Sequence, residues 1–382
     1  MTDRLPHLRL RVATRTLLAA LALAAPPPAE ARRLVEPGDL LVGAGDLLCV
    51  VRADGGGVAP FSPREGSGAN QLHAPSGIAV DGARERVFAT DFGGALLLID
   101  PEDGAQTRVE NNLGGTLPVG DTLSGLDILG DGSLLVGSID VSSGFPLPSY
   151  AARIDLVSTP NDQARAIVAP ASDPLGSGPI GFLVGLSVAE PGIGDTQLLV
   201  TVLNGLGSAL SSVSPDGTVT PIAGVPMQEN ALVTEPDVDC SAGLASLCVR
   251  YWAEARIVST DCIPSDATIF RASFGGTQEI FSGPPLRCPF AVEAASSGDQ
   301  VFVLDANPDF TEPRIHRLDR NPISDEFTAV LIADDTELPD LANVALPGLA
   351  ISPVALPEPA AGGAAAALLA LAVLGSGRRR RP

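Results

Sequence analysis

Lysine is absent from this sequence of 382 residues, and histidine occurs only three times. His7 lies close to the N-terminus, so the main part of the chain holds only His73 and His316. Histidine-based catalytic triads and histidine-bound metal centres therefore have few residues to draw on. His316 alternates with Ile315 and Arg317 in a strand-like segment, which favours a structural role. No glycine-rich phosphate-binding motif is present either. We predict no catalytic residue.

Charged residues are also few, at 18%, and most of them are acidic, which gives a formal net charge of −21. A chain this acidic repels phosphate backbones, and this excludes nucleic acid as a partner. The same charge favours solubility and attracts divalent cations. The composition thus points to a soluble, acidic domain.

Glycine and proline are abundant, with 41 and 34 residues scattered without a period. This pattern is typical of many short strands joined by tight turns. The length and the 45% hydrophobic content suffice for one large packed domain or two smaller ones. We therefore expect an all-β fold.

The N-terminus has the order of a secretory signal peptide. Four arginines lie within the first 15 residues, residues 17–25 are apolar, and Ala29-Glu30-Ala31 has the small-x-small pattern of a signal peptidase site. The alternative is an uncleaved anchor, but the apolar run is shorter than the roughly 20 residues that span a bilayer. We predict a signal peptide over residues 1–31, cleaved after Ala31.

The C-terminus carries a second composite signal. Pro357-Glu358-Pro359 is followed by the apolar residues 360–374 and by the arginine cluster Arg378, Arg379, Arg380 and Arg381. This order resembles the PEP-CTERM sorting tails over about the last 26 residues. The resemblance implies a tail over 356–382 that is held in the inner membrane, with the arginines cytoplasmic, until an exosortase cuts near Pro-Glu-Pro. The alternative is a plain C-terminal membrane anchor.

Residues 32–355 contain a repeat of glycine, a large aliphatic residue, any residue, and valine or isoleucine. The six occurrences, two of them variants, start 48, 60, 58, 46 and 59 residues apart. They are Gly77-Ile78-Ala79-Val80, Gly125-Leu126-Asp127-Ile128, Gly185-Leu186-Ser187-Val188, Gly243-Leu244-Ala245-Ser246-Leu247, Pro289-Phe290-Ala291-Val292 and Gly348-Leu349-Ala350-Ile351. This spacing suits the four-stranded blades of a β-propeller.

The first blade lacks an inner strand, because residues 39–43, 47–52 and 58–61 supply only three strands. We predict that residues 345–351 pair with 39–43, which closes the ring and removes an open sheet edge. The fold class predicted is thus all-β, a six-bladed β-propeller closed by a C-terminal strand, between a signal peptide and a C-terminal sorting helix. A β-sandwich is the alternative, although it gives no reason for six repeats.

The second blade, Ala74-Pro75-Ser76-Gly77-Ile78-Ala79-Val80-Asp81 through Val87-Phe88-Ala89-Thr90-Asp91, resembles an NHL repeat. It also resembles the wider group that includes gluconolactonase-like propellers. The resemblance implies the fold and, in that group, a metal held by Glu, Asn and Asp. It does not define an activity here.

Acidic or amide residues end the second strand of blades two to six. They are Asp91, Asp140, Asn204, Asp261 and Asp305. These oxygens would form a ring at one face of the propeller, where a cation or polar ligand could bind. The alternative, which repetition in nearly every blade favours, is that each side chain accepts hydrogen bonds from backbone N–H groups of turns.

One loop has the alternating oxygens of a calcium site, and calcium is the one cofactor that the sequence suggests. Asp305, Asn307 and Asp309 are spaced like calcium ligands, with Glu312 nearby. Phe310, however, stands where an EF-hand has glycine, and no closing glutamate follows.

Four of the five cysteines cluster around the fifth blade, and an exported protein would form disulfides there. We favour Cys262–Cys288 together with Cys240–Cys248, among three possible pairings. Cys49 alternates with apolar residues and is predicted to be a buried free thiol.

Two functions remain open. The first is a non-catalytic propeller on the outer surface or in the extracellular matrix of a Gram-negative bacterium, binding an envelope protein, a surface polysaccharide or an ion. The second is a metal-dependent hydrolase of the gluconolactonase-like type. Signal peptidase and exosortase are the partners expected during processing. A tight Glu, Asn and Asp cluster at the channel mouth would favour the hydrolase.

Overall fold

A computed structural model describes residues 35–62, 72–91, 93–101, 104–109, 122–129, 132–139, 149–154, 164–168, 182–189, 197–204, 207–213, 219–221, 231–233, 237–239, 248–258, 261–273, 276–309, 311–339 and 348–352. The predicted signal peptide and sorting tail lie outside these residues. Within them, one short 3₁₀ helix, η3 (Pro264–Asp266), accompanies 26 β-strands. No helix in this part of the chain is long and apolar enough to cross a membrane.

The described strands form six antiparallel sheets, which we number in chain order. Sheet 1 runs β26 (Leu349–Ile351), β1 (Leu40–Ala44), β2 (Leu47–Val51), β3 (Val58–Ser62). Sheet 2 runs β4 (Pro75–Asp81), β5 (Arg86–Asp91), β6 (Ala95–Ile99), β7 (Gln106–Arg108). Sheet 3 runs β8 (Thr122–Ile128), β9 (Leu134–Ile139), β10 (Ser149–Ile154), β11 (Ala164–Val168).

The second half of the chain supplies the other three sheets. Sheet 4 runs β12 (Phe182–Ala189), β13 (Gln197–Asn204), β14 (Gly207–Val213), β15 (Val219–Pro221). Sheet 5 runs β16 (Ala231–Val233), β18 (Val249–Val258), β20 (Thr268–Ser273), β21 (Gly276–Ser282), and both β17 (Asp237–Asp239) and β19 (Asp261–Cys262) pair with β18. Sheet 6 runs β22 (Cys288–Ala294), β23 (Gln300–Ala306), β24 (Arg314–Arg320), β25 (Phe327–Ala333).

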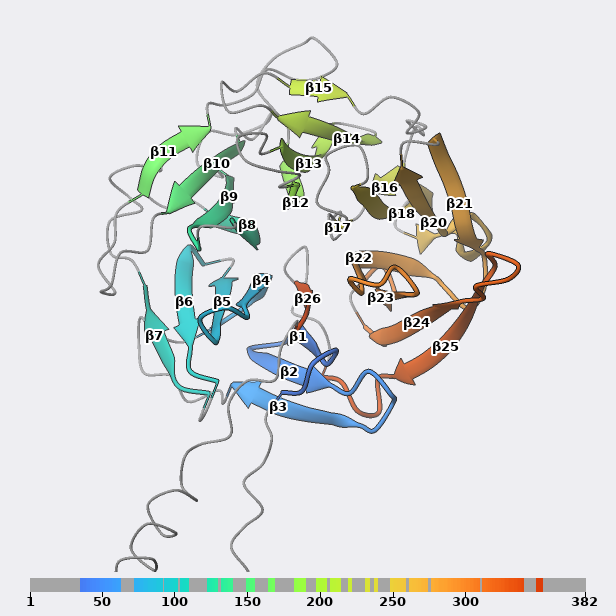
Figure 1. Cartoon of the computed structure of the whole chain (residues 1–382), viewed down its shortest axis with the longest axis horizontal. Coiled ribbons are helices and arrows are strands. Elements are labelled where there is room, and N and C mark those ends of the chain that lie inside the picture. Colours follow the sequence, from blue (N-terminus) through green and yellow to red (C-terminus); the bar gives the residue numbers. More distant parts are fainter. Residues whose placement is uncertain are drawn as a thin grey trace, which may run out of the picture. The chain divides into compact units, whose positions relative to one another are not determined.

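One strand or strand pair of each sheet faces a common centre: β26 with β1, β4, β8, β12, β17 and β22 (Figure 1). These inner strands contact one another in succession: β1 and β26 contact β4, β4 contacts β8, β8 contacts β12, β12 contacts β17, β17 contacts β22, and β22 contacts β26. The succession confirms the all-β propeller arrangement that the repeats predict.

The glycine of the repeat has a steric reason. A Cβ added at Gly77 would lie 2.7 Å from the backbone of Gly125 and Leu126 in the next inner strand. A Cβ at Gly348 would lie 3.0 Å from the Cα of Gly77. Neighbouring inner strands therefore approach too closely for a side chain at these positions.

The predicted closure is confirmed for the described part of the C-terminal strand. Leu40, Leu41 and Val42 of β1 pair with Ile351, Ala350 and Leu349 of β26. Residues 345–347 of the predicted strand lie outside the described residues. The first and last strands that the structure describes thus share one sheet, and an edge that would otherwise be open is paired.

Residues 243–247, predicted as the inner strand of the fifth blade, lie outside the described residues, so this stays a prediction. Among the described strands, β17 lies between β12 and β22. The edge of β18 opposite β20 pairs with β17 at residues 249–251 and with β16 at residues 254–256.

Candidate functional site

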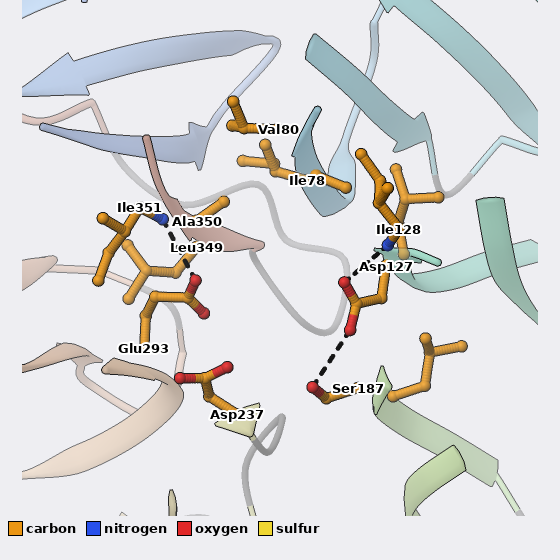
Figure 2. Close-up of a pocket in the computed structure, with 13 residues that line it drawn as sticks. Ile78, Val80, Asp127, Ile128, Ser187, Asp237, Glu293, Leu349, Ala350 and Ile351 are labelled. Atoms are coloured by element: carbon orange, nitrogen blue, oxygen red, sulfur yellow. Dashed lines mark hydrogen bonds between the residues drawn. The ribbon is translucent and has the colours of Figure 1, made fainter. Parts of the chain in front are cut away.

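The inner strands enclose a cavity of about 130 Å³ at the centre of the sheets (Figure 2). Its lining comes from all six sheets. The residues are Ile78, Ala79, Val80, Leu126, Asp127, Ile128, Leu186, Ser187, Asp237, Glu293, Leu349, Ala350 and Ile351. Most of this wall is aliphatic, and the polar groups are three carboxylates and one hydroxyl.

Asp127 and Ser187 occupy the same place in consecutive repeats. Each is the third residue of its repeat when the glycine is counted as the first. The Ser187 hydroxyl donates to Asp127 Oδ2 at 3.2 Å, and the backbone N–H of Ile128 donates to Asp127 Oδ1 at 2.7 Å. Figure 2 shows the two side chains pointing toward each other from β8 and β12. This bond ties the inner strand of sheet 3 to that of sheet 4.

Asp237 and Glu293 lie on the other side of the cavity (Figure 2). Asp237 Oδ2 accepts the backbone N–H of Ala294 at 2.8 Å, and Glu293 Oε1 accepts that of Ile351 at 3.3 Å. Each carboxylate of the cavity therefore accepts a hydrogen bond from the following inner strand. The three acids hold sheets 3 and 4, sheets 5 and 6, and sheets 6 and 1 together.

The electrostatic character of the cavity follows from the described residues that line it, which include three carboxylates and no arginine or histidine. Low-dielectric aliphatic walls strengthen the field of these charges, and the cavity therefore favours a positively charged group. Among the described residues, no group of three or more His, Cys, Asp or Glu is placed to hold a metal ion. The acids are spread around the cavity rather than gathered at one point.

Asp91 and Asp305, the two members of the predicted oxygen ring whose side chains the structure describes, do not line this cavity. Asp140 lies outside the described residues, and Asn204 and Asp261 lie in strands whose side chains are not described there. Asp91 accepts the N–H groups of His73 and Ala74, and Asp305 those of Arg287 and Cys288. At these two positions the alternative interpretation, backbone capping, describes the geometry.

The cavity acids were not predicted from the sequence. For Asp127 a signal existed, because it is the one charged residue at the third position of any of the six repeats. Asp237 precedes the fourth repeat, which starts at Gly243, and Glu293 follows the fifth, which starts at Pro289, so the repeat pattern gives no indication of either.

An arginine takes the place of a cation in the suggested calcium loop. Arg287 Nη1 donates to Asn307 Oδ1 at 2.8 Å and to Glu312 Oε2 at 2.6 Å, and this guanidinium lowers the pKa of Glu312. Asp309 Oδ1 accepts from the backbone and the hydroxyl of Thr311. The oxygens of the loop thus have protein partners, and the geometry lends no support to the calcium prediction.

The disulfide Cys262–Cys288 is formed, with the two Cα atoms 5.5 Å apart, as the sequence predicts. Cys248 is also disulfide-bonded, while its predicted partner Cys240 lies outside the described residues. Cys49 is a buried free thiol, and burial raises its pKa to about 11. The prediction for Cys49 is confirmed.

No protein-family model matches the chain, and no curated protein matches it in sequence. Solved structures resemble it at low identity. A provisionally named TolB from Agrobacterium tumefaciens is 11% identical, with a TM-score of 0.48, 83% of this chain covered and 99% of the other. A provisionally named 6-phosphogluconolactonase from Bacteroides fragilis is 10% identical, with a TM-score of 0.49 and coverages of 85% and 99%. TolB from Acinetobacter baumannii is 11% identical, with a TM-score of 0.47 and coverages of 82% and 66%. At these values the similar structures assign no activity to the chain.

Proposed function

We propose that this chain is an exported, non-catalytic envelope protein whose propeller binds a positively charged group in its central cavity. That group belongs either to a small ligand or to the protruding side chain of a partner. The observation that carries this proposal is the cavity lining: Asp127, Asp237 and Glu293 come from three separate sheets, and no basic side chain is among the lining residues that the structure describes. The aliphatic wall suits the carbon stem of an organic cation, whose charge the carboxylates would balance.

The six sheets are proposed to be the six blades of one ring, closed by β26. Signal peptidase cleavage after Ala31 and PEP-CTERM sorting of residues 356–382 are proposed with it. Both rest on the order of charged and apolar segments at the two ends of the sequence. These signals would place the propeller outside the cytoplasmic membrane, in the envelope or in the extracellular matrix.

Calorimetric titration of the full chain tests the binding proposal. The probes are 1,4-diaminobutane, calcium and neutral glucose. We expect the diamine to bind, with an affinity that falls as salt is added, because charge pairing is screened. Asp127→Asn should weaken it about tenfold, since a hydrogen bond to a charged group contributes about 1.5 kcal/mol or more. Asp319→Asn, on β24 outside the cavity lining, is the matched control.

Two results would overturn this proposal. Equal affinities in the wild type and in Asp127→Asn, or no binding of either cation, would exclude the cavity as a cation site. Calcium-dependent hydrolysis of glucono-1,5-lactone that Asp127→Asn abolishes would establish the hydrolase alternative instead.

Intact mass of the protein isolated from its native host tests the proposed processing. The expected mass lacks residues 1–31 and the arginine cluster at 378–381. A mass that retains Arg378 to Arg381 would contradict exosortase cleavage and favour the plain membrane anchor.

A further inference from the structure

We propose that the Cys262–Cys288 disulfide is a latch, set by oxidation once the chain has left the cytoplasm, that fixes the inner strand of sheet 6 and with it the Glu293 side of the cavity. The timing rests on the proposed export. The mechanical role of the bond rests on the geometry of sheets 5 and 6 alone.

The bond joins two different sheets. Cys262 lies on β19, which folds back on the end of β18 and pairs Cys262 with Ile257. Cys288 is the first residue of β22, 26 residues further along the chain. The closed loop contains the outer strands β20 and β21 of sheet 5, and the bond links the β18–β19 end of sheet 5 to the start of sheet 6. A cross-link of this kind restricts the separation of the two sheets.

The strand that starts at the latch ends at the cavity. From Cys288, β22 runs to Glu293 and Ala294, whose hydrogen bonds reach Ile351 of β26 and Asp237 of β17. β22 is thus the inner strand through which sheet 6 holds both of its neighbours at the cavity. Movement at Cys288 would be transmitted along this short, largely buried strand to both hydrogen bonds.

Sheet 2 indicates that the disulfide is an addition rather than a requirement of the turn. There Ala74 stands where sheet 6 has Cys288: both precede a proline that pairs with the capping aspartate, Pro75 with Asp91 and Pro289 with Asp305. In both sheets the aspartate accepts the N–H of the residue before the proline. Alanine at position 288 should therefore preserve the turn.

The chemistry balances as thiol–disulfide exchange. Outside the cytoplasm, Cys262 and Cys288 would give two electrons and two protons to an oxidant that itself carries a disulfide. That disulfide is reduced to two thiols. Reduction by dithiothreitol runs in reverse. Its thiolate attacks Cys262, the more exposed of the two residues, and Cys288 leaves as a thiolate that takes up a proton. The reagent's second thiol then displaces the Cys262 sulfur, which is also protonated, and closes the reagent's own disulfide ring. Cys49 lies in the same apolar cluster as Cys288, but it stays protonated at neutral pH and so does not attack the bond.

Hydrogen exchange measured by mass spectrometry on the full chain tests the latch. Oxidised protein, protein reduced with dithiothreitol, and Cys288→Ala are compared, and alkylation followed by mass confirms the state of each bond. We expect peptides covering β22 and β17 to exchange at least several-fold faster in the reduced protein and in Cys288→Ala, while peptides covering β4 stay unchanged.

Cys288→Ala also controls for the second disulfide, because Cys248 keeps its bond in that variant. A further increase in β22 exchange when Cys288→Ala is reduced would assign the effect to Cys248 and overturn the proposal. Unchanged β22 exchange after proven reduction of Cys262–Cys288 would overturn it too. These outcomes do not depend on cation binding or on export, so the latch and the proposed function can fail separately. If Cys288→Ala did not fold, Cys262→Ala with the same readout would replace it.

Discussion

Sheets 2 and 6 begin with the same backbone clamp, by which we mean an aspartate that accepts the N–H groups of the two residues before the proline of the inner strand. The two clamps lie in different surroundings. In sheet 2, Asp91 accepts the N–H groups of His73 and Ala74 and that of Gly93 in its own turn. In sheet 6, both oxygens of Asp305 accept the N–H of Arg287, and Oδ1 also accepts that of Cys288. The repeat has thus built one backbone device twice.

The difference lies in what surrounds the clamp. In sheet 6, Cys288 is bonded to Cys262, Arg287 reaches Asn307 and Glu312, and His316 Nε2 lies 3.9 Å from Asp305 Oδ2. Burial raises the pKa of Asp305 to about 6 and lowers that of His316 to about 4. In sheet 2, Leu97 holds the place of His316, since Leu97 pairs with Ala89 as His316 pairs with Val303.

The comparison shows that the clamp of sheet 2 stabilises its turn by hydrogen bonds alone, whereas the turn of sheet 6 is stabilised by further interactions as well. Sheet 2 depends on hydrogen bonds to a single carboxylate. Sheet 6 has a covalent bond and an ion pair in addition, and its carboxylate is penalised by burial at neutral pH. Substitutions at four positions, Asp91, Asp305, His316 and Arg287, separate these contributions.

The largest effect is expected for Asp91→Ala. This change leaves up to three N–H groups without their acceptor, and each unpaired buried donor costs about 1–3 kcal/mol, so the free energy of unfolding should fall by about 2–4 kcal/mol. Asp305→Ala should cost only about 1–2 kcal/mol in oxidised protein, because the disulfide holds the turn and the burial penalty on Asp305 is removed. Urea unfolding at pH 7 measures both.

Asp91→Asn, which keeps one acceptor oxygen, is the control and should lie between the wild type and Asp91→Ala. Equal losses for Asp91→Ala and Asp305→Ala would mean that the disulfide and the ion pair add nothing to the clamp of sheet 6.

A smaller effect, visible as a pH profile, is expected for His316→Leu, which copies Leu97 of sheet 2. Between pH 4 and 6 the folded state keeps a proton on Asp305 that the unfolded state releases, so this group's contribution to stability falls as pH rises. His316 acts in the opposite direction, because the unfolded state binds a proton that the folded state excludes, so stability rises from pH 4 to 6.5. In the wild type the two slopes oppose each other.

His316→Leu should leave the falling slope of Asp305, and Asp305→Asn should leave the rising slope of His316. Urea unfolding at half-unit pH steps gives the two profiles, each taken as the difference from the wild type. Parallel profiles for the two variants would show that the pair does not titrate in this way. Because neither ring nitrogen of His316 has a hydrogen-bond partner, His316→Leu should not weaken the protein at pH 7.

The smallest effect is expected for Arg287→Ala. The Arg287–Glu312 pair is largely exposed, and such pairs add little to stability in salt solution. The melting temperature should fall slightly at low salt and match the wild type at high salt, as the pair is screened. His73→Ala, at the equivalent place in sheet 2, is the control and should show no salt dependence. A large loss at both salt concentrations would make Arg287 a packing residue rather than an ion-pair partner.

The sequence predicted most of this architecture where local backbone geometry is decisive. The glycine repeats marked the inner strands of sheets 2, 3 and 4 and the closing strand, because a glycine is required where Gly77 meets Gly125. In sheet 5 the repeat at residues 243–247 lies outside the described residues, and the described strand that reaches the centre is Asp237–Asp239, which contains no glycine. A pattern set by close strand approach cannot predict a strand that lacks its marker.

The candidate site divides in the same way. The capping role of Asp91 and Asp305 was open to sequence reasoning, because an acid at the end of a strand next to a turn has backbone N–H groups within reach. The acids of the cavity bond partners 57, 58 and 60 residues away. Nothing in a single segment indicates which inner strand will lie beside it, or which of its oxygens will be used.

By itself, then, the sequence predicted most of the strands, their turns and the closing of the first sheet by the last strand, and it favoured the pairing of Cys262 with Cys288 among three possibilities. These follow from backbone sterics, from the period of two residues along a strand and from cysteine spacing. Only the tertiary structure decided that Asp127, Asp237 and Glu293 share one cavity and that an arginine lies in the loop of Asn307 and Glu312. Those contacts depend on the order in which sheets pack around the centre, and a side chain finds its distant partner only after that packing is complete.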